Sequence, residues 1–175
     1  MSDTKPSSTQ IGAIAENLVA NALILDSNGN LAPFRPIADD EGIDLLVYHK
    51  PSGRVLPLQV KARTVTLKRP RSQRRGNTVH FEVRKVVVVR NHRTYLLAVL
   101  LGEAATRIEA AWLLPLAQLP SVGAARREKY VIRASRLSTT TDKYRTFLCS
   151  STAEIVRRLI TMFERFDKRW PPSDV

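Results

Sequence analysis

The stretch that decides the fold runs from Gly42 to Arg63 and reads GIDLLVYHKPSGRVLPLQVKAR. Two runs rich in branched and aromatic residues, 43–48 and 55–62, flank Pro-Ser-Gly at 51–53. Such residues suit a pleated strand, and proline with glycine favours a turn. The sequence therefore predicts a buried β-hairpin.

Three polar residues interrupt this apolar hairpin. Asp44 lies near the start of the first strand, and Gln59 and Lys61 lie inside the second. Because strand residues two apart share a face, the side chains of Gln59 and Lys61 point the same way, and their apolar neighbours point the other way. A carboxylate, an amide and an amine brought together in this setting call for a functional explanation.

The composition is that of a globular protein with an unusual charge. The 175 residues are 43% hydrophobic and 25% charged, which predicts a single domain over residues 9–175 after a disordered leader at 1–8. Lys and Arg number 28 against 16 Asp and Glu, for a net charge of +12. Such an excess favours a polyanionic partner, most often nucleic acid. A membrane surface is disfavoured because no basic helix with a bulky apolar face begins the chain.

Several other classes of protein are excluded. The single cysteine, Cys149, rules out an internal disulfide and a cysteine-based zinc site. No apolar run is long enough for a signal peptide or a membrane span, so the sequence predicts a cytoplasmic protein. With only 7 glycines the chain also lacks a phosphate-cradling glycine-rich loop.

The remaining pattern predicts a mixed α/β fold. A helix is expected over residues 9–25, and Glu16 is the one charged residue between Lys5 and Asp26. Strands are expected at 31–37, 78–84, 94–101 and 107–114, with a short edge strand at 129–134. Ser151 and Glu154 form a capping box before a closing helix that ends near residue 170. We therefore expect a mixed central sheet flanked by an N-terminal and a C-terminal helix.

A basic segment follows the hairpin. Residues 68–75 read KRPRSQRR, with five positive charges and no acid. A solvated surface loop is the simplest interpretation. Its position beside the polar hairpin instead favours contacts with nucleic-acid phosphates, made by Arg63, Lys68, Arg69, Arg71, Arg74 and Arg75.

Asp44 followed by Gln59-Val60-Lys61 on the next strand resembles the catalytic motif of the PD-(D/E)XK nuclease superfamily. Restriction-endonuclease-like and Holliday-junction-resolvase-like domains share this motif, in which an Asp begins one strand and an acidic residue, any residue and a Lys lie on its antiparallel neighbour. Glu16 matches a Glu on the helix that precedes the family core. The resemblance covers about residues 10–101. Gln59 stands where the commonest form has Glu or Asp, so the chain resembles a QxK variant.

The resemblance implies a restriction-endonuclease-like core and a metal-dependent endonuclease acting on DNA, with RNA not excluded and a homodimer as one option. The implied ligands of Mg²⁺ or Mn²⁺ are Asp44, the Gln59 side chain, the Val60 carbonyl and Glu16. Lys61 would activate the attacking water and stabilise the phosphorane charge. The implied catalytic residues are therefore Glu16, Asp44, Gln59 and Lys61.

Two alternatives stay open. The first is a nucleic-acid-binding protein on the same fold in which Gln59 marks a loss of chemistry. The second is a basic adaptor whose charge serves an acidic protein partner.

Overall fold

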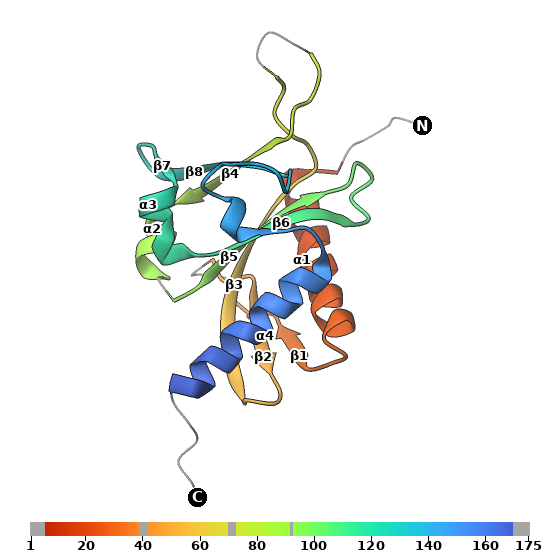
Figure 1. Ribbon diagram of the computed structural model, residues 1–175, viewed down its shortest axis with the longest axis vertical. Helices are drawn as coiled ribbons and strands as arrows, with labels where there is room; N and C mark the ends of the chain where they lie inside the picture. Colours follow the sequence, from red (N-terminus) through yellow and green to blue (C-terminus); the bar gives the residue numbers. More distant parts are fainter. Residues whose placement is uncertain (1–5, 39–41, 70–72, 92, 170–175) are drawn as a thin grey trace, which may run out of the picture.

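The computed structural model describes residues 6–38, 42–69, 73–91 and 93–169, with the backbone alone for 166–169. Two β-sheets and two long helices make up the fold (Figure 1). In chain order the elements are α1 (Ser8–Asp26), β1 (Leu31–Phe34), β2 (Leu45–His49), β3 (Arg54–Arg63), β4 (Thr78–Arg84), α2 (Lys85–Arg90), β5 (Tyr95–Leu101), β6 (Ile108–Pro115), α3 (Leu119–Val122), β7 (Ala124–Ala125), β8 (Lys129–Ser135), β9 (Leu148–Cys149) and α4 (Thr152–Arg169).

The central sheet is mixed, as predicted. Its six strands follow the order β1-β2-β3-β5-β6-β9. Strands β3 and β5 are parallel, and every other neighbouring pair is antiparallel. The connection from β3 to β5 carries β4 and α2, because parallel strands need a long crossover.

The alternation along β3 separates a helix-covered face from a polar one. Leu56, Leu58 and Val60 belong to the apolar core that α1 and α4 share with this face of the sheet. Figure 1 shows the two helices packed side by side over it. Gln59 and Lys61 project from the opposite face because the side-chain period of a strand is two. The predicted segregation of these polar side chains is confirmed.

A second sheet covers part of that opposite face. It has the order β4-β8-β7, and Phe81 of β4 pairs with Ile132 of β8. Both side chains are buried together with Trp112 of the central sheet. The strand predicted at 129–134 is present as β8, but its predicted edge position is wrong, because β8 is the middle strand of this second sheet. Local sequence cannot report which strands lie on either side.

Both long helices begin with side-chain caps. The Ser7 hydroxyl accepts the Gln10 N–H, and the Gln10 side chain accepts the Ser7 N–H. Helix α1 therefore starts within the predicted leader, whose residues 1–5 lie outside the described ranges. At α4 the Ser151 hydroxyl accepts the Glu154 N–H at 3.2 Å, as the capping box predicts. The Glu154 carboxylate reaches back to the Ser150 N–H at 2.9 Å, one residue earlier than expected.

Helix α2 forms from a sequence, KVVVVR, with poor helix propensity. The sequence analysis assigned no element to these residues. Val87 and Val88 are buried against the second sheet's side of the core, so tertiary packing outweighs the propensity of a β-branched run. Within the described residues, none of the helices has the length and apolar character needed to cross a membrane.

Candidate functional site

The site lies at the start of β2, where the pairing of β2 with β3 stops. Leu45, the first residue of β2, pairs with Leu58, while β3 continues to Arg63. The Asp44 N–H donates to the Leu58 carbonyl at 2.9 Å. Beyond that point the Asp44 side chain takes the place of a strand partner, because its Oδ2 accepts the Val60 N–H at 2.6 Å. A backbone amide therefore fixes the position of the Asp44 carboxylate.

The Val60 carbonyl points toward the same place. The N–H and C=O of one strand residue face the same edge of the strand. Since the Val60 N–H meets Asp44, the Val60 carbonyl also faces the edge that β2 has left. Two oxygen-bearing groups, one from a side chain and one from the backbone, are thus brought together by strand geometry.

Gln59 adds a third oxygen. Its side chain is buried, with 2% of the residue exposed, and its Nε2 donates to the Gly42 carbonyl at 2.9 Å. Only the NH₂ end of an amide can donate to a carbonyl, so this bond decides which end is the oxygen. The buried Oε1 has no hydrogen-bond partner among the described residues. Leaving such an atom unsatisfied costs about 1–3 kcal/mol, which a cation or a donor at the site would recover.

Gly42 is suited to its place on two counts. Its φ of +74° lies in the left-handed region, which side-chain-bearing residues rarely adopt. A Cβ at this position would also stand 2.9 Å from Gln59 Nε2. The glycine therefore allows the close approach that orients the Gln59 amide.

Asp44, Gln59 and Lys61 line one cavity of about 310 Å³. Three of the four predicted catalytic side chains are thus brought together. Cationic side chains outnumber acidic ones around this cavity, whose other lining residues are Gly42, Arg63, Glu82, Arg84, Val87 and Lys129. The surroundings suit an anionic ligand held above a small group of oxygens.

The far wall of the cavity comes from the second sheet, and the sequence analysis missed it. Lys129 Nζ of β8 lies 2.6 Å from Glu82 Oε2 of β4, and His80 Nε2 lies 3.2 Å from Glu82 Oε1. Hydrogen bonds from Lys129 and then His80 lower the pKa of the Glu82 carboxyl. Lys129 and Glu82 are 47 residues apart in the chain, and no local sequence pattern predicts their contact.

Glu16 does not line the cavity. Its Oε2 is 3.8 Å from the Arg35 guanidinium, and about a quarter of its side chain is exposed. Arg35 follows Phe34, which pairs with Leu46 two residues after Asp44. Glu16 therefore lies beside the end of β1, on the helix that covers the opposite face of the sheet from Gln59 and Lys61.

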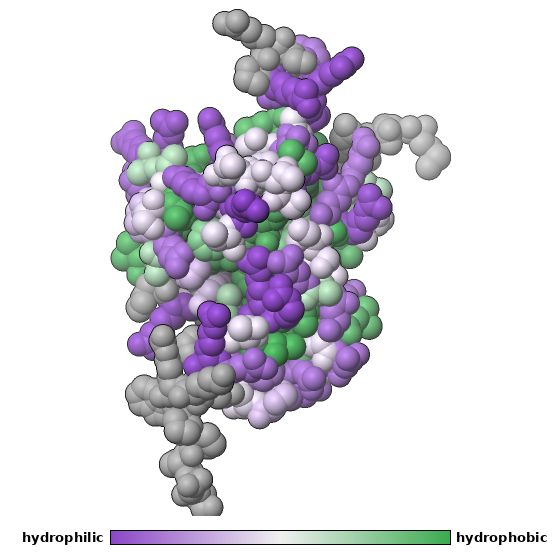
Figure 2. Space-filling view, viewed as in Figure 1, coloured by the Kyte–Doolittle hydropathy of each residue, from purple (hydrophilic) through white to green (hydrophobic). Residues whose placement is uncertain are grey.

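The predicted phosphate-contacting residues divide between the cavity and a basic arm (residues 64–69 and 73–77). The arm projects from the body of the molecule, and the described part of its outer end is hydrophilic (Figures 1 and 2), whereas Val65 and Leu67 nearer its base are exposed apolar side chains. The Arg69 N–H donates to the Arg74 carbonyl at 2.9 Å, and the backbones of Lys68 and Arg75 form an isolated antiparallel β-bridge. Arg63 lines the cavity and donates through Nε to the His80 carbonyl at 3.0 Å. Arg71 lies outside the described residues.

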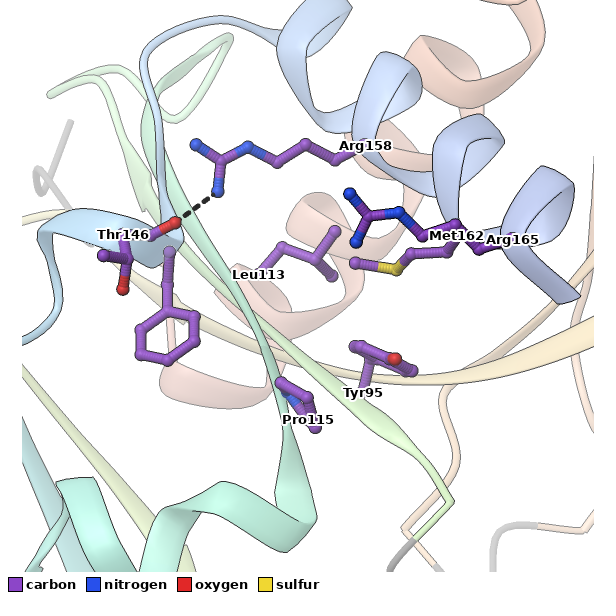
Figure 3. Close-up of a pocket in the computed structure, with 8 residues that line it drawn as sticks. Tyr95, Leu113, Pro115, Thr146, Arg158, Met162 and Arg165 are labelled. Carbon is purple, nitrogen blue, oxygen red and sulfur yellow. Dashed lines mark hydrogen bonds between the residues drawn. The ribbon is translucent and has the colours of Figure 1, made fainter.

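A slightly larger cavity, about 350 Å³, lies beneath α4 on the helix-covered face. Figure 3 shows Arg158 and Arg165 of α4 above Leu113 and Tyr95. Arg158 is held by the Thr146 and Leu148 carbonyls at 2.7 Å each. Among the residues that the structure describes, no Asp, Glu, Gln or Lys lines this cavity, so it lacks the set of ligands found around Asp44.

The oxygens around Asp44 fit a hard divalent cation. In the described parts of the chain no three His, Cys, Asp or Glu side chains gather into a metal-binding group. Asp44, the Gln59 Oε1 and the Val60 carbonyl nevertheless offer the oxygen ligands that Mg²⁺ prefers, and Mg²⁺ usually keeps several waters. The unsatisfied Oε1 is the observation that supports this fit.

Comparisons with solved structures place the fold. The bacterial homing endonuclease I-Ssp6803I aligns over 94% of this chain and 99% of its own, with a TM-score of 0.59 and 13% identity. A Holliday junction resolvase from the archaeon Archaeoglobus fulgidus aligns over 77% of this chain and 96% of its own, with a TM-score of 0.43 and 12% identity. No protein-family model and no curated protein sequence matches the chain. The chain therefore has a restriction-endonuclease-like fold, a mixed α/β architecture that it shares with this homing endonuclease.

Proposed function

We propose that the protein is a metal-dependent nuclease that hydrolyses the phosphodiester backbone of DNA. One observation carries the proposal: the backbone-anchored carboxylate of Asp44 and the unsatisfied Oε1 of Gln59 share a cavity with the amine of Lys61. The likeness of the fold to that of a homing endonuclease supports it.

The proposed roles follow from the positions of these groups. Asp44, the Gln59 Oε1 and the Val60 carbonyl would hold Mg²⁺ or Mn²⁺, which supplies Lewis-acid polarisation of the scissile phosphate. Lys61 orients the attacking water and stabilises the charge that develops on the phosphoryl oxygens. Arg63 and the basic arm bind neighbouring phosphates without reading base sequence.

Glu16 is proposed as a fourth contributor, although it does not line the cavity. Gln59 provides an oxygen without a negative charge, and the Glu16 carboxylate would supply that charge. For this role the Glu16 carboxylate must leave its contact with Arg35 and move into the site. The pair is partly exposed, so the ion pair opposes the exchange by about 0–1 kcal/mol.

A DNA-binding protein without cleavage is the second candidate. The lack of a three-residue acidic or histidine group in the described part of the chain favours it. A cytoplasmic location and a homodimer, which would let one assembly cut both strands of a duplex, remain predictions. RNA remains an alternative substrate.

The Lys61→Met variant tests the proposed chemistry. The substitution keeps an unbranched apolar stem and removes the ammonium group. We expect wild-type protein to cleave plasmid DNA with Mg²⁺ and not with EDTA, and the variant to lose about 10²–10³-fold in rate, as for removal of one transition-state donor. Arg165→Gln on α4 removes one positive charge far from the cavity and should retain the wild-type rate. Equal rates for Lys61→Met and wild type would contradict the proposal.

The Glu16→Gln variant tests the fourth contributor. It removes the carboxylate charge and should abolish Mg²⁺-dependent cleavage, while the melting temperature changes little because the lost ion pair is partly exposed. Arg35→Gln is the matched control, since it breaks the same ion pair and keeps the carboxylate. Cleavage by the Glu16→Gln protein at the wild-type rate would remove Glu16 from the site.

A further inference from the structure

We propose that the outer face of the second sheet is a docking surface for the DNA backbone, connecting the basic arm to the cavity around Asp44. This inference rests on the proposed function and extends it to a surface that the sequence did not indicate. The outer face is defined by the outward side chains of two paired strands, His80, Glu82 and Arg84 of β4 and Lys129 and Arg133 of β8.

Strand register puts these side chains on one surface. In the antiparallel pair of β4 and β8, His80 is opposite Arg133 and Arg84 is opposite Lys129. The residues between them, such as Phe81 and Ile132, are buried against the central sheet. Because side chains alternate along a strand, the inward residues anchor the sheet and the charged residues share its outer side. Val131 also lies on the outer side, opposite Glu82, and is buried.

The charges on this face are incompletely neutralised. Arg84 and Arg133 are exposed, and neither has a carboxylate partner among the described residues. Lys129 is paired with Glu82, the one acidic side chain of the outer face. Arg84 and Lys129 also stand directly opposite each other, and like charges at such positions are destabilising. A phosphate placed between them would turn this repulsion into attraction on both sides.

The dimensions and position of the face suit a nucleic-acid strand. The cross-strand pair of Arg84 and Lys129 is four residues from the pair of His80 and Arg133, a distance of about 13 Å at 3.3 Å per residue. That length corresponds to about four phosphates of one DNA strand measured along the helix axis.

The outer face is continuous with the two features already described. At one end, Glu82, Arg84 and Lys129 line the cavity. At the other end the basic arm joins β4, where the Leu67 N–H donates to the Thr78 carbonyl at 2.7 Å. A strand held on this face would therefore pass from the arm to Lys61 along a surface on which Arg84, Lys129 and Arg133 outnumber the one carboxylate, that of Glu82.

The salt dependence of DNA binding tests this surface. We would measure the fluorescence anisotropy of a labelled duplex in EDTA at several KCl concentrations. The double variant Arg84→Gln/Arg133→Gln should reduce the slope of log Kd against log salt by about 2, because each lost phosphate contact removes about one unit. The double variant Arg157→Gln/Arg165→Gln on α4 removes the same charge from the opposite side of the central sheet and should keep the wild-type slope.

Glu82→Gln gives a prediction of opposite sign. The substitution neutralises the carboxylate that pairs with Lys129 and keeps a hydrogen-bond acceptor for it. We expect tighter binding and a slope larger by about 1, because Lys129 gains a phosphate contact. A misfolded protein would not bind DNA more tightly, so a gain in affinity for this variant cannot be explained by loss of structure.

The outcomes separate this inference from the proposed nuclease activity. An unchanged slope for Arg84→Gln/Arg133→Gln, or an equal decrease in the α4 control, would overturn the docking surface even if the protein cleaves DNA. The expected slopes in a protein that does not cleave with Mg²⁺ would support the surface and contradict the nuclease. Wild-type protein that fails to bind the duplex would overturn the surface.

Discussion

Asp44→Asn should abolish Mg²⁺-dependent DNA cleavage while the protein keeps its fold. An asparagine carbonyl can still accept the Val60 N–H that the Asp44 Oδ2 accepts at 2.6 Å, so the backbone anchor survives. The negative charge at this position is lost. Because the proposed cation contributes several kcal/mol to the transition state, we expect a loss on the order of 10³-fold in rate.

A second aspartate supplies the matched control. Asp142 also accepts backbone amides, from Ser135 at 2.7 Å and Tyr144 at 2.9 Å, and it lies outside the cavity. Asp142→Asn removes the same charge and should retain cleavage. Thermal unfolding provides a readout besides activity, since Mg²⁺ should raise the melting temperature of wild type and not that of Asp44→Asn. Cleavage by Asp44→Asn at the wild-type rate would contradict the proposed site.

Gln59→Glu should destabilise the protein in EDTA, although glutamate is the commoner residue in the motif. The Gln59 Nε2 donates to the Gly42 carbonyl at 2.9 Å, and a carboxylate oxygen in its place would face another acceptor. The position is also buried, so an ionised carboxylate there loses its water. We expect a loss of about 2–4 kcal/mol in the free energy of unfolding without metal.

Mg²⁺ should reverse much of this loss. A cation beside the new carboxylate would neutralise it, and a ligand that binds the folded state alone stabilises it by mass action. The variant should therefore show a larger Mg²⁺-dependent rise in melting temperature than wild type. Gln118→Glu makes the same chemical change at an exposed position and should stay within about 0.5 kcal/mol of wild type in both conditions. If Gln59→Glu has the same free energy of unfolding as wild type in EDTA, the hydrogen bond to the Gly42 carbonyl does not fix the orientation of the Gln59 side chain.

Local sequence determined the two long helices, the longer strands and the facing of the polar residues, but not α2 or the short strands β7 and β9. The predicted strand at 78–84 has the observed bounds of β4, and the two long helices begin and end within a few residues of their predicted limits. These features depend on hydrophobic period, turn residues and caps, which a short stretch carries in full. The shared face of Gln59 and Lys61 follows from the two-residue period of one strand.

Only the tertiary structure decided what surrounds that face. The choice of β8 as the partner of β4 depends on the packing of Phe81 and Ile132 against Trp112, and it brings Lys129 and Arg84 to the cavity. The orientation of the Gln59 amide depends on a carbonyl supplied by Gly42, 17 residues earlier. Such contacts join distant parts of the chain through hydrogen bonds and close packing, and no period in the sequence encodes them.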